Sequence, residues 1–135
     1  MNDLVANFEL DKESGSVSLS MLPFMHTGVV LMIAWTNAWC DQRGIKPVWT
    51  SWIRTEMQNA RLNGTKVHVE GRGADLSLKF QYGWNEFYVN EFEADFNAEF
   101  EEIGAFAWKD DELVSRPLVL HDSGHGYHAH LQSRP

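Results

Sequence analysis

The sequence predicts an α+β domain in which helices pack on one side of a small, mainly antiparallel sheet. Segments 28–40 and 86–103 have the length and the apolar pattern of helices. Several short segments around them alternate apolar and polar residues, or are brief apolar runs bounded by turn residues, as strands do. With 135 residues, 13% of them aromatic, the chain has enough bulky apolar surface for a core of its own. We therefore expect one domain over residues 1–135.

The N-terminal part and the first helix are predicted from local patterns. Residues 1–26 are expected to form a hairpin extension, because segments 8–11 and 16–20 alternate in polarity around a polar turn. From about Thr27 the pattern changes to an apolar helix, which should end before Gly44. This apolar stretch is too short to span a hydrocarbon layer of about 30 Å, so we expect it to be buried in the domain.

The rest of the chain predicts short strands and a second, amphipathic helix. Phe92, Phe96 and Phe100 recur at every fourth position, so the helix over 86–103 should bury an aromatic stripe and expose an acidic face. Residues 56–62 have the pattern of one or two helical turns. The expected strands are 48–53, 75–80, 117–120 and 127–131.

Charge and cysteine content exclude several classes of function. The net charge of −8 disfavours nucleic acid as a partner, because a polyanion would be repelled. The single cysteine, Cys40, excludes an internal disulfide and a cysteine-rich zinc site, and its apolar surroundings indicate a buried residue.

The first residues lack the pattern of a secretory signal, so we expect synthesis in the cytoplasm and no membrane span.

Histidines and a carboxylate form the most distinctive pattern in the sequence. Three of the six histidines, His125, His128 and His130, have the spacing His-x-x-His-x-His. On a strand, His128 and His130 would share a face and line one pocket. Together with His68 and Asp75 they offer the imidazole and carboxylate ligands of a catalytic zinc site, in which one coordination position stays open.

Two further histidines and one arginine can be explained without a metal site. His26 and His121 match no motif, and we expect them to be surface or structural residues. Arg54 follows an expected strand, where it would either bind a ligand or pair with the acidic helix. For the metal site itself, the alternative is that the C-terminal histidines are a chance cluster and that Asp75 faces solvent.

Residues 68–75, His-Val-Glu-Gly-Arg-Gly-Ala-Asp, resemble a known zinc motif. The motif, His-x-x-Gly-x-Ala-x-Asp, belongs to the D-Ala-D-Ala carboxypeptidase and L-alanyl-D-glutamate endopeptidase family, which is related to penicillin-insensitive murein endopeptidases and to the Hedgehog domain. Segment 51–54 is similar to the Ser-x-x-Arg segment that precedes this motif in the family, and the C-terminal histidines are similar to a murein endopeptidase cluster. The resemblance covers about residues 28–132 and implies a Hedgehog-like α+β fold.

The resemblance also implies a chemistry and a set of site residues. One zinc ion per chain would be bound by His68, Asp75 and His130, and would lower the pKa of a bound water toward ~7. His128, with His125 or Asp122 nearby, would transfer the proton, and Arg54 would hold a substrate carboxylate or the oxyanion. The implied reaction is hydrolysis of peptide bonds in peptidoglycan stem or cross-link peptides.

Departures from the family pattern leave an alternative function open. Gly73 replaces the usual alanine, Lys66 replaces a serine, and Tyr127 stands where many members have an acidic general base. The missing acid favours a non-catalytic, zinc-containing binding or structural module, for example a virion protein. If the chain is an enzyme, we expect a phage-type lytic or virion-associated enzyme that reaches the cell wall after release or on a virion.

Overall fold

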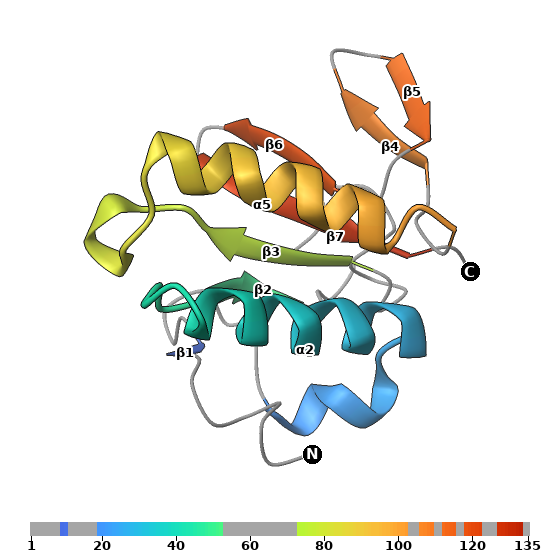
Figure 1. Cartoon of the computed structure of the whole chain (residues 1–135). Helices are drawn as coiled ribbons and strands as arrows, with labels where there is room; N and C mark the ends of the chain where they lie inside the picture. The colour runs from blue at the N-terminus through green and yellow to red at the C-terminus, as the bar shows by residue number, and fades with distance from the viewer. Residues whose placement is uncertain are drawn as a thin grey trace.

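The computed structural model confirms the α+β class (Figure 1). It describes residues 9–10, 19–52, 73–102, 106–109, 112–115, 118–122 and 127–133. The helices are the 3-10 helix η1 (Leu19–Phe24), α2 (Thr27–Asp41), the 3-10 helix η2 (Phe80–Tyr82) and α5 (Glu86–Glu99). The strands are β1 (Glu9–Leu10), β2 (Val48–Ser51), β3 (Gly73–Ser77), β4 (Phe106–Lys109), β5 (Glu112–Ser115), β6 (Leu118–Asp122) and β7 (Tyr127–Gln132).

The main sheet is mostly antiparallel, as expected. Its strand order is β1-β2-β3-β7-β6, and only the short β1 pairs in parallel, with β2. Strands β4 and β5 pair with each other in a separate hairpin. The two central neighbours, β3 and β7, come from distant parts of the chain, so this pairing brings the middle and the end of the sequence together.

Strands β3 and β7 have one apolar and one polar face. On the apolar face, Ala74 lies across from Leu131, and Leu76 lies across from Ala129; all four are fully buried. Because side chains alternate along a strand, the residues between them point to the other side of the sheet. We call this other side the polar face; its members are Asp75, Ser77, His128, His130 and Gln132.

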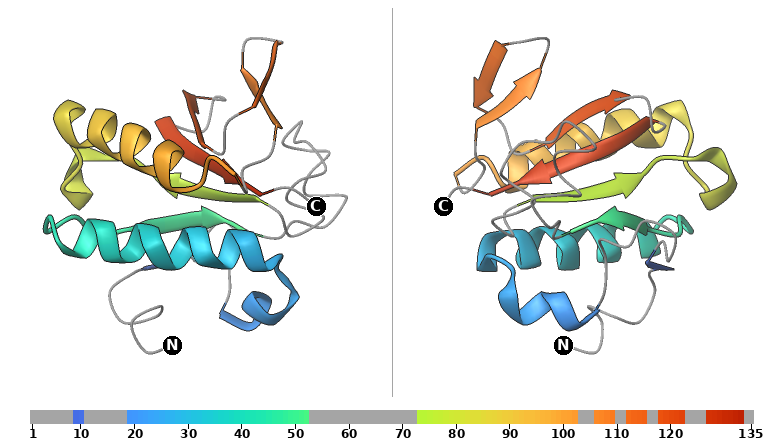
Figure 2. Two further views of the ribbon diagram at one scale, coloured as in Figure 1. Left: turned by 45° about the vertical axis from the view of Figure 1, so that its right-hand side comes forward. Right: turned by 180° about the vertical axis from the view of Figure 1, so that it is seen from behind.

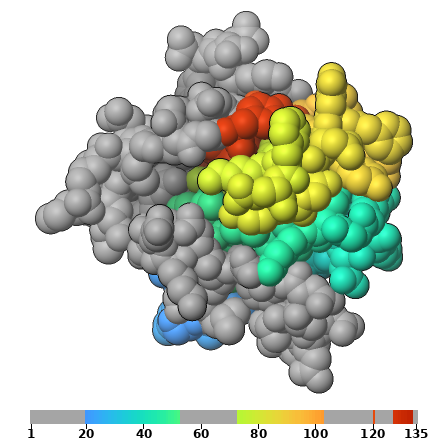
Figure 3. Space-filling model, turned by 90° about the vertical axis from the view of Figure 1, so that its left-hand side faces the viewer, coloured from blue at the N-terminus to red at the C-terminus, as the bar shows by residue number. Residues whose placement is uncertain are grey.

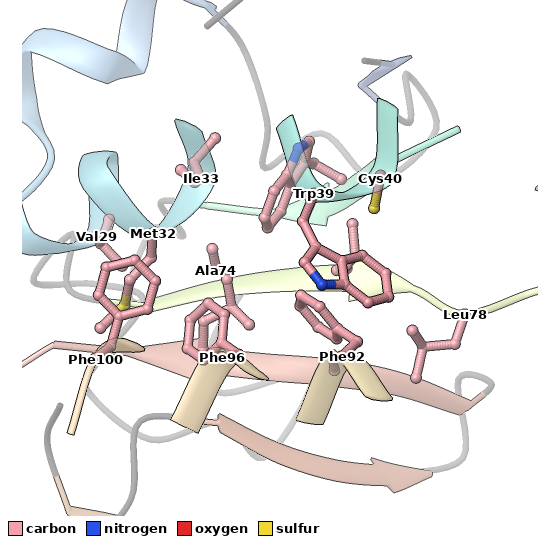
Figure 4. Close-up of a cluster of buried hydrophobic side chains, with 14 of the residues drawn as sticks. Val29, Met32, Ile33, Trp39, Cys40, Ala74, Leu78, Phe92, Phe96 and Phe100 are labelled. Atoms are coloured by element: carbon pink, nitrogen blue, oxygen red, sulfur yellow. The ribbon is translucent and has the colours of Figure 1, made fainter. Parts of the chain in front are cut away.

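Both long helices pack on the apolar face, which confirms that the helices lie on one side of the sheet. Seen from behind, the strands lie in front of α2 and α5 (Figure 2). The aromatic stripe of α5 meets tryptophans of α2. The ring centroids of Trp39 and Phe92 are 5.1 Å apart (Figure 4), and those of Trp35 and Phe96 are 5.6 Å apart. Phe92, Phe96 and Phe100 are buried as predicted. Because both helices pack on the apolar face, neither α2 nor α5 covers the polar face.

The first turn of α2 is tied to the end of β7 through His26. The Nδ1 atom of His26 accepts hydrogen bonds from the backbone N–H of Gly28 and from Ser133 Oγ, each at 3.1 Å. The first of these bonds caps the helix by satisfying a backbone donor that has no partner within the helix. A Cβ atom on Gly28 would lie only 2.9 Å from Ser133 Cβ, so the close contact requires glycine. His26 is thus a structural residue, as expected.

The other end of α2 is joined to α5 by Arg43. Its guanidinium donates to Glu91 Oε1 at 2.7 and 3.0 Å and lies 3.8 Å from the ring centroid of Trp39. Trp39 Nε1 in turn donates to Asp95 Oδ2 at 2.9 Å. Just beyond, Gly44 takes a positive φ of 70°, consistent with the predicted helix end. The acidic face of α5 is therefore partly neutralised by α2.

Three expected elements in the middle of the chain have different bounds in the structure, and the first is the strand expected over 48–53, which is β2 and ends at Ser51. The strand expected over 75–80 is β3, which ends at Ser77, because its last partner in the ladder is His128; Phe80 already belongs to η2. The helix expected to reach residue 103 ends at Glu99. Acidic residues near the C-terminus of a helix are unfavourable for its dipole, and a run of them begins at Glu99.

The expected N-terminal hairpin is corrected where the structure describes it. Strand β1 pairs with β2, and Leu19 and Ser20, the end of the expected second strand, belong to η1. Met21 and Leu22 of η1 pack against the core, which a short polar alternation in the sequence does not reveal. Residues 11–18 lie outside the described part. Among the described helices, none is long and apolar enough to cross a membrane.

Candidate metal centre

Asp75 and His130, two of the three expected metal ligands, face each other across β3 and β7. Their Cα atoms are register partners, and Asp75 Oδ1 lies 2.9 Å from His130 Nδ1. The side chains are only 8% and 14% exposed, respectively. The alternative in which Asp75 faces solvent is therefore excluded, and a carboxylate and an imidazole from distant parts of the sequence share one nearly buried position.

The spacing of these two groups fits a zinc ion. Zinc binds carboxylate oxygen and imidazole nitrogen at about 2.0 Å, which puts two ligands of a tetrahedral site about 3.3 Å apart. The observed 2.9 Å between Oδ1 and Nδ1 is a hydrogen-bond distance, so the two side chains would have to separate slightly to reach that value. The donor set, one carboxylate oxygen and one aromatic nitrogen, is also among those that zinc binds in proteins.

Gln132 lies beside His130 and was not predicted from the sequence. The Nε2 atom of His130 lies 2.7 Å from Gln132 Oε1, so both ring nitrogens face oxygen atoms. Gln132 is buried, with 4% of its surface exposed. The available signal was the His-x-Gln spacing, because residues two apart on a strand share a face.

His128 lies on the same face, one strand repeat before His130, as predicted. It is half-buried, and its register partners are Ser77 on β3 and His121 on β6. A strand rises by about 3.3 Å per residue, so positions 128 and 130 are about 7 Å apart. His128 therefore lies on the same side of the sheet as His130, one strand repeat away. His121, expected to be only structural, occupies the ladder position across from it.

The strand on the other side of Asp75 carries the beginning of the second motif. Ser51, the first residue of the Ser-x-x-Arg-like segment, is the register partner of Asp75 and is buried. Its neighbour Thr50 donates through Oγ1 to the backbone carbonyl of Asp75 at 3.4 Å. The structure thus brings Ser51, the first residue of this segment, next to Asp75, the last residue of the His-x-x-Gly-x-Ala-x-Asp-like motif.

Three of the predicted site residues lie outside the described part of the chain: Arg54, His68 and His125. The segment 56–62 lies outside it as well. No group of three or more histidine, cysteine or acidic side chains with the geometry of a metal site is present among the described residues. Of the three expected metal ligands, the structure describes Asp75 and His130.

Tyr127, which stands in place of the expected acidic base, is the first residue of β7 and by strand alternation lies on the side of Ala129 and Leu131, opposite to the polar face. The start of β7 reaches the surface beside the residues that follow β3 (Figure 3), and Tyr127 is 49% exposed. Partial burial, with added repulsion from Glu93, raises the pKa of Tyr127 above its ordinary value. A neutral phenol at pH 7 can donate a hydrogen bond but does not replace a carboxylate base.

Cys40 lies on α2, away from the polar face, and burial strongly raises the pKa of its thiol, although the nearby Arg43 opposes the shift. Because the thiolate is the reactive form, we expect Cys40 to resist alkylation in the folded protein. Mass spectrometry after iodoacetamide treatment should show almost no modification without denaturant and full modification in guanidinium. Rapid labelling of the folded protein would contradict this burial.

Comparisons of this chain with models of known protein families, with curated protein sequences and with solved protein structures found no match. The site is therefore judged by its residues and their geometry.

Proposed function

We propose that this protein is a zinc-dependent peptidase that hydrolyses peptide bonds in peptidoglycan stem or cross-link peptides. The observation that supports this proposal is the pair formed by Asp75 and His130, which lie 2.9 Å apart although 55 positions separate them in the sequence. The zinc motif that the sequence resembles assigns metal binding to these same two residues. A chance cluster of histidines would not require a buried carboxylate at this position.

In the proposed site, one zinc ion per chain is held by His68, Asp75 and His130. The ion would supply an activated water and polarise the scissile carbonyl. His128, on the same strand face, accepts and returns a proton during bond cleavage, with His125 or Asp122 as a supporting group. Arg54 binds a carboxylate of the substrate or steadies the oxyanion through its fork of N–H donors.

The place of action follows from the proposed substrate. Peptidoglycan lies outside the cytoplasmic membrane, so the proposed enzyme would meet its substrate at the cell wall, after release or as part of a virion. We propose a phage-type lytic or virion-associated enzyme, with peptidoglycan peptides as substrate and virion proteins as candidate partners. The charge of −8 argues against nucleic acid in either setting.

A second candidate function is a non-catalytic module that keeps the zinc site and binds a partner such as a virion protein. The observation that favours it is Tyr127, a half-exposed tyrosine in place of an acidic base. This candidate needs the same metal ligands but makes no use of His128 as a proton carrier. The two functions therefore differ in one measurable property, chelator-sensitive cleavage.

The proposed function is tested by incubating the protein with purified cell walls and identifying released peptides by mass spectrometry. We expect cleavage that a chelator stops and that added zinc restores. His128→Ala should lose about 100-fold or more of the rate, as removal of a general acid–base does, while still binding zinc. His26→Asn is the matched control, because it removes an imidazole at the start of α2 but keeps a good cap.

Each outcome of this experiment tests a different part of the proposal. Cleavage that persists in chelator would rule out the zinc mechanism. Bound zinc without any cleavage, in walls of several bacterial types, would exclude the peptidase and leave the binding module. Equal rates for His128→Ala and His26→Asn would remove His128 from the mechanism.

A further inference from the structure

We propose that Gln132 is a positioning residue that selects the tautomer of His130 and so decides which ring nitrogen binds the metal. This inference rests on the zinc site of the proposed function and adds a residue to it. In the proposed arrangement, His130 Nε2–H donates to Gln132 Oε1, and the lone pair of Nδ1 points toward Asp75. The metal then lies between His130 Nδ1 and Asp75 Oδ1.

The distances around the imidazole support this assignment. Nε2 lies 2.7 Å from Gln132 Oε1, and Nδ1 lies 2.9 Å from Asp75 Oδ1. A neutral imidazole carries a single N–H, so it can donate to only one of these two oxygens. If the proton is on Nε2, a lone pair on Nδ1 faces a carboxylate, and this contact is favourable only with a metal ion or a second proton between the two atoms.

Burial strengthens the hydrogen bond between Gln132 and His130. Gln132 is 4% exposed and the side chain of His130 is 14% exposed, so water competes poorly for the hydrogen bond between them. The register partner of Gln132 is Gly73, which has no side chain to occupy the space across the ladder. Because only 4% of Gln132 is exposed, its amide is held beside the ring, as expected for a group that orients a metal-binding histidine.

The test is zinc affinity, measured by competition with a chromophoric chelator, for wild type and three variants. Loss of a group that orients a metal-binding histidine typically weakens metal affinity by about 10–100-fold, and we expect this for Gln132→Leu. Gln132→Glu keeps an acceptor oxygen and should bind zinc at least as tightly as wild type. Gln81→Leu, at an exposed position of η2, is the matched control and should leave affinity unchanged.

A second measurement does not depend on any variant. A long-range ¹H–¹⁵N spectrum of the zinc-loaded protein reports which nitrogen of His130 carries the proton. We expect a proton on Nε2 and zinc on Nδ1; the reverse arrangement would overturn the inference. Circular dichroism in chelator shows whether Gln132→Leu still folds, so a weaker affinity is not mistaken for unfolding.

The outcomes separate this inference from the proposed function. Unchanged zinc affinity in folded Gln132→Leu would overturn the role of Gln132 and leave the peptidase intact. Zinc binding that depends on Gln132, without cleavage of cell walls, would support the inference and refute the peptidase. A wild-type protein that binds no zinc would refute both.

Discussion

Asp75→Asn is expected to lose zinc and peptidase activity together. Asparagine keeps the shape of the side chain but removes the negative charge with which Asp75 faces His130 at 2.9 Å. A direct ligand contributes more than a group that only orients one, so zinc affinity should fall by more than ~100-fold. Elemental analysis of purified, untagged protein measures the metal, and release of peptides from cell walls measures the activity. His130→Ala should behave in the same way.

The matched control is Asp41→Asn, at the exposed C-terminal end of α2, which should keep full zinc content and activity. His68→Ala tests the third expected ligand and should lose the metal as well. Thermal unfolding gives an independent readout, because a ligand at 100 times its dissociation constant stabilises the folded state by about 2.7 kcal/mol. Zinc should therefore raise the melting temperature of wild type but not of Asp75→Asn. Full metal occupancy in Asp75→Asn would disprove the ligand assignment.

The sequence predicts the apolar side of this fold well, because local periodicity carries the information. The spacing of Phe92 and Phe96 identifies the buried face of α5 without any knowledge of its partner. The apolar run of α2 likewise predicts a buried helix, and burial of Trp39 and Cys40 confirms it. Such patterns report which face of an element is buried, and in this chain they were enough to define the core.

Strand pairing is harder to predict from the sequence, because it joins residues that are far apart in the chain. The spacing of His128 and His130 predicts that they share a face, but it does not say that Asp75 lies across from His130 instead of His128. That choice is set by the register of β3 and β7, in which Ser77 takes the place across from His128. The motif resemblance predicted Asp75 and His130 as ligands, and the pairing of β3 with β7 brings the two side chains into contact.

Other features had weak or misleading signals. The hairpin of β4 and β5 was not anticipated, and the expected partner of β1 was a local strand instead of β2. Gln132 was missed because an amide is not a typical zinc ligand, so a search for ligand types passes over it. Its role depends on a contact with His130 that exists only once β7 has formed.

Phe96→Ala tests whether the two faces of the sheet are separable. Phe96 is fully buried, with Trp35 at 5.6 Å and Phe100 at 4.7 Å between ring centroids, so truncation should cost about 3–5 kcal/mol of unfolding free energy. For a domain of this size that corresponds to a fall of about 10 °C or more in melting temperature. Phe87→Ala, at a position 70% exposed on the same helix, is the control and should change little.

The same variant also bears on the metal site. Phe96 packs on the apolar face, whereas Asp75 and His130 lie on the polar face, so Phe96→Ala should still bind one zinc at a temperature where it is folded. Calorimetry with and without zinc should show a lower melting temperature but a similar stabilisation by the metal. Loss of zinc from the folded variant would mean that helix packing sets the register of β3 and β7. In that case the core, and not the ladder alone, would hold Asp75 opposite His130.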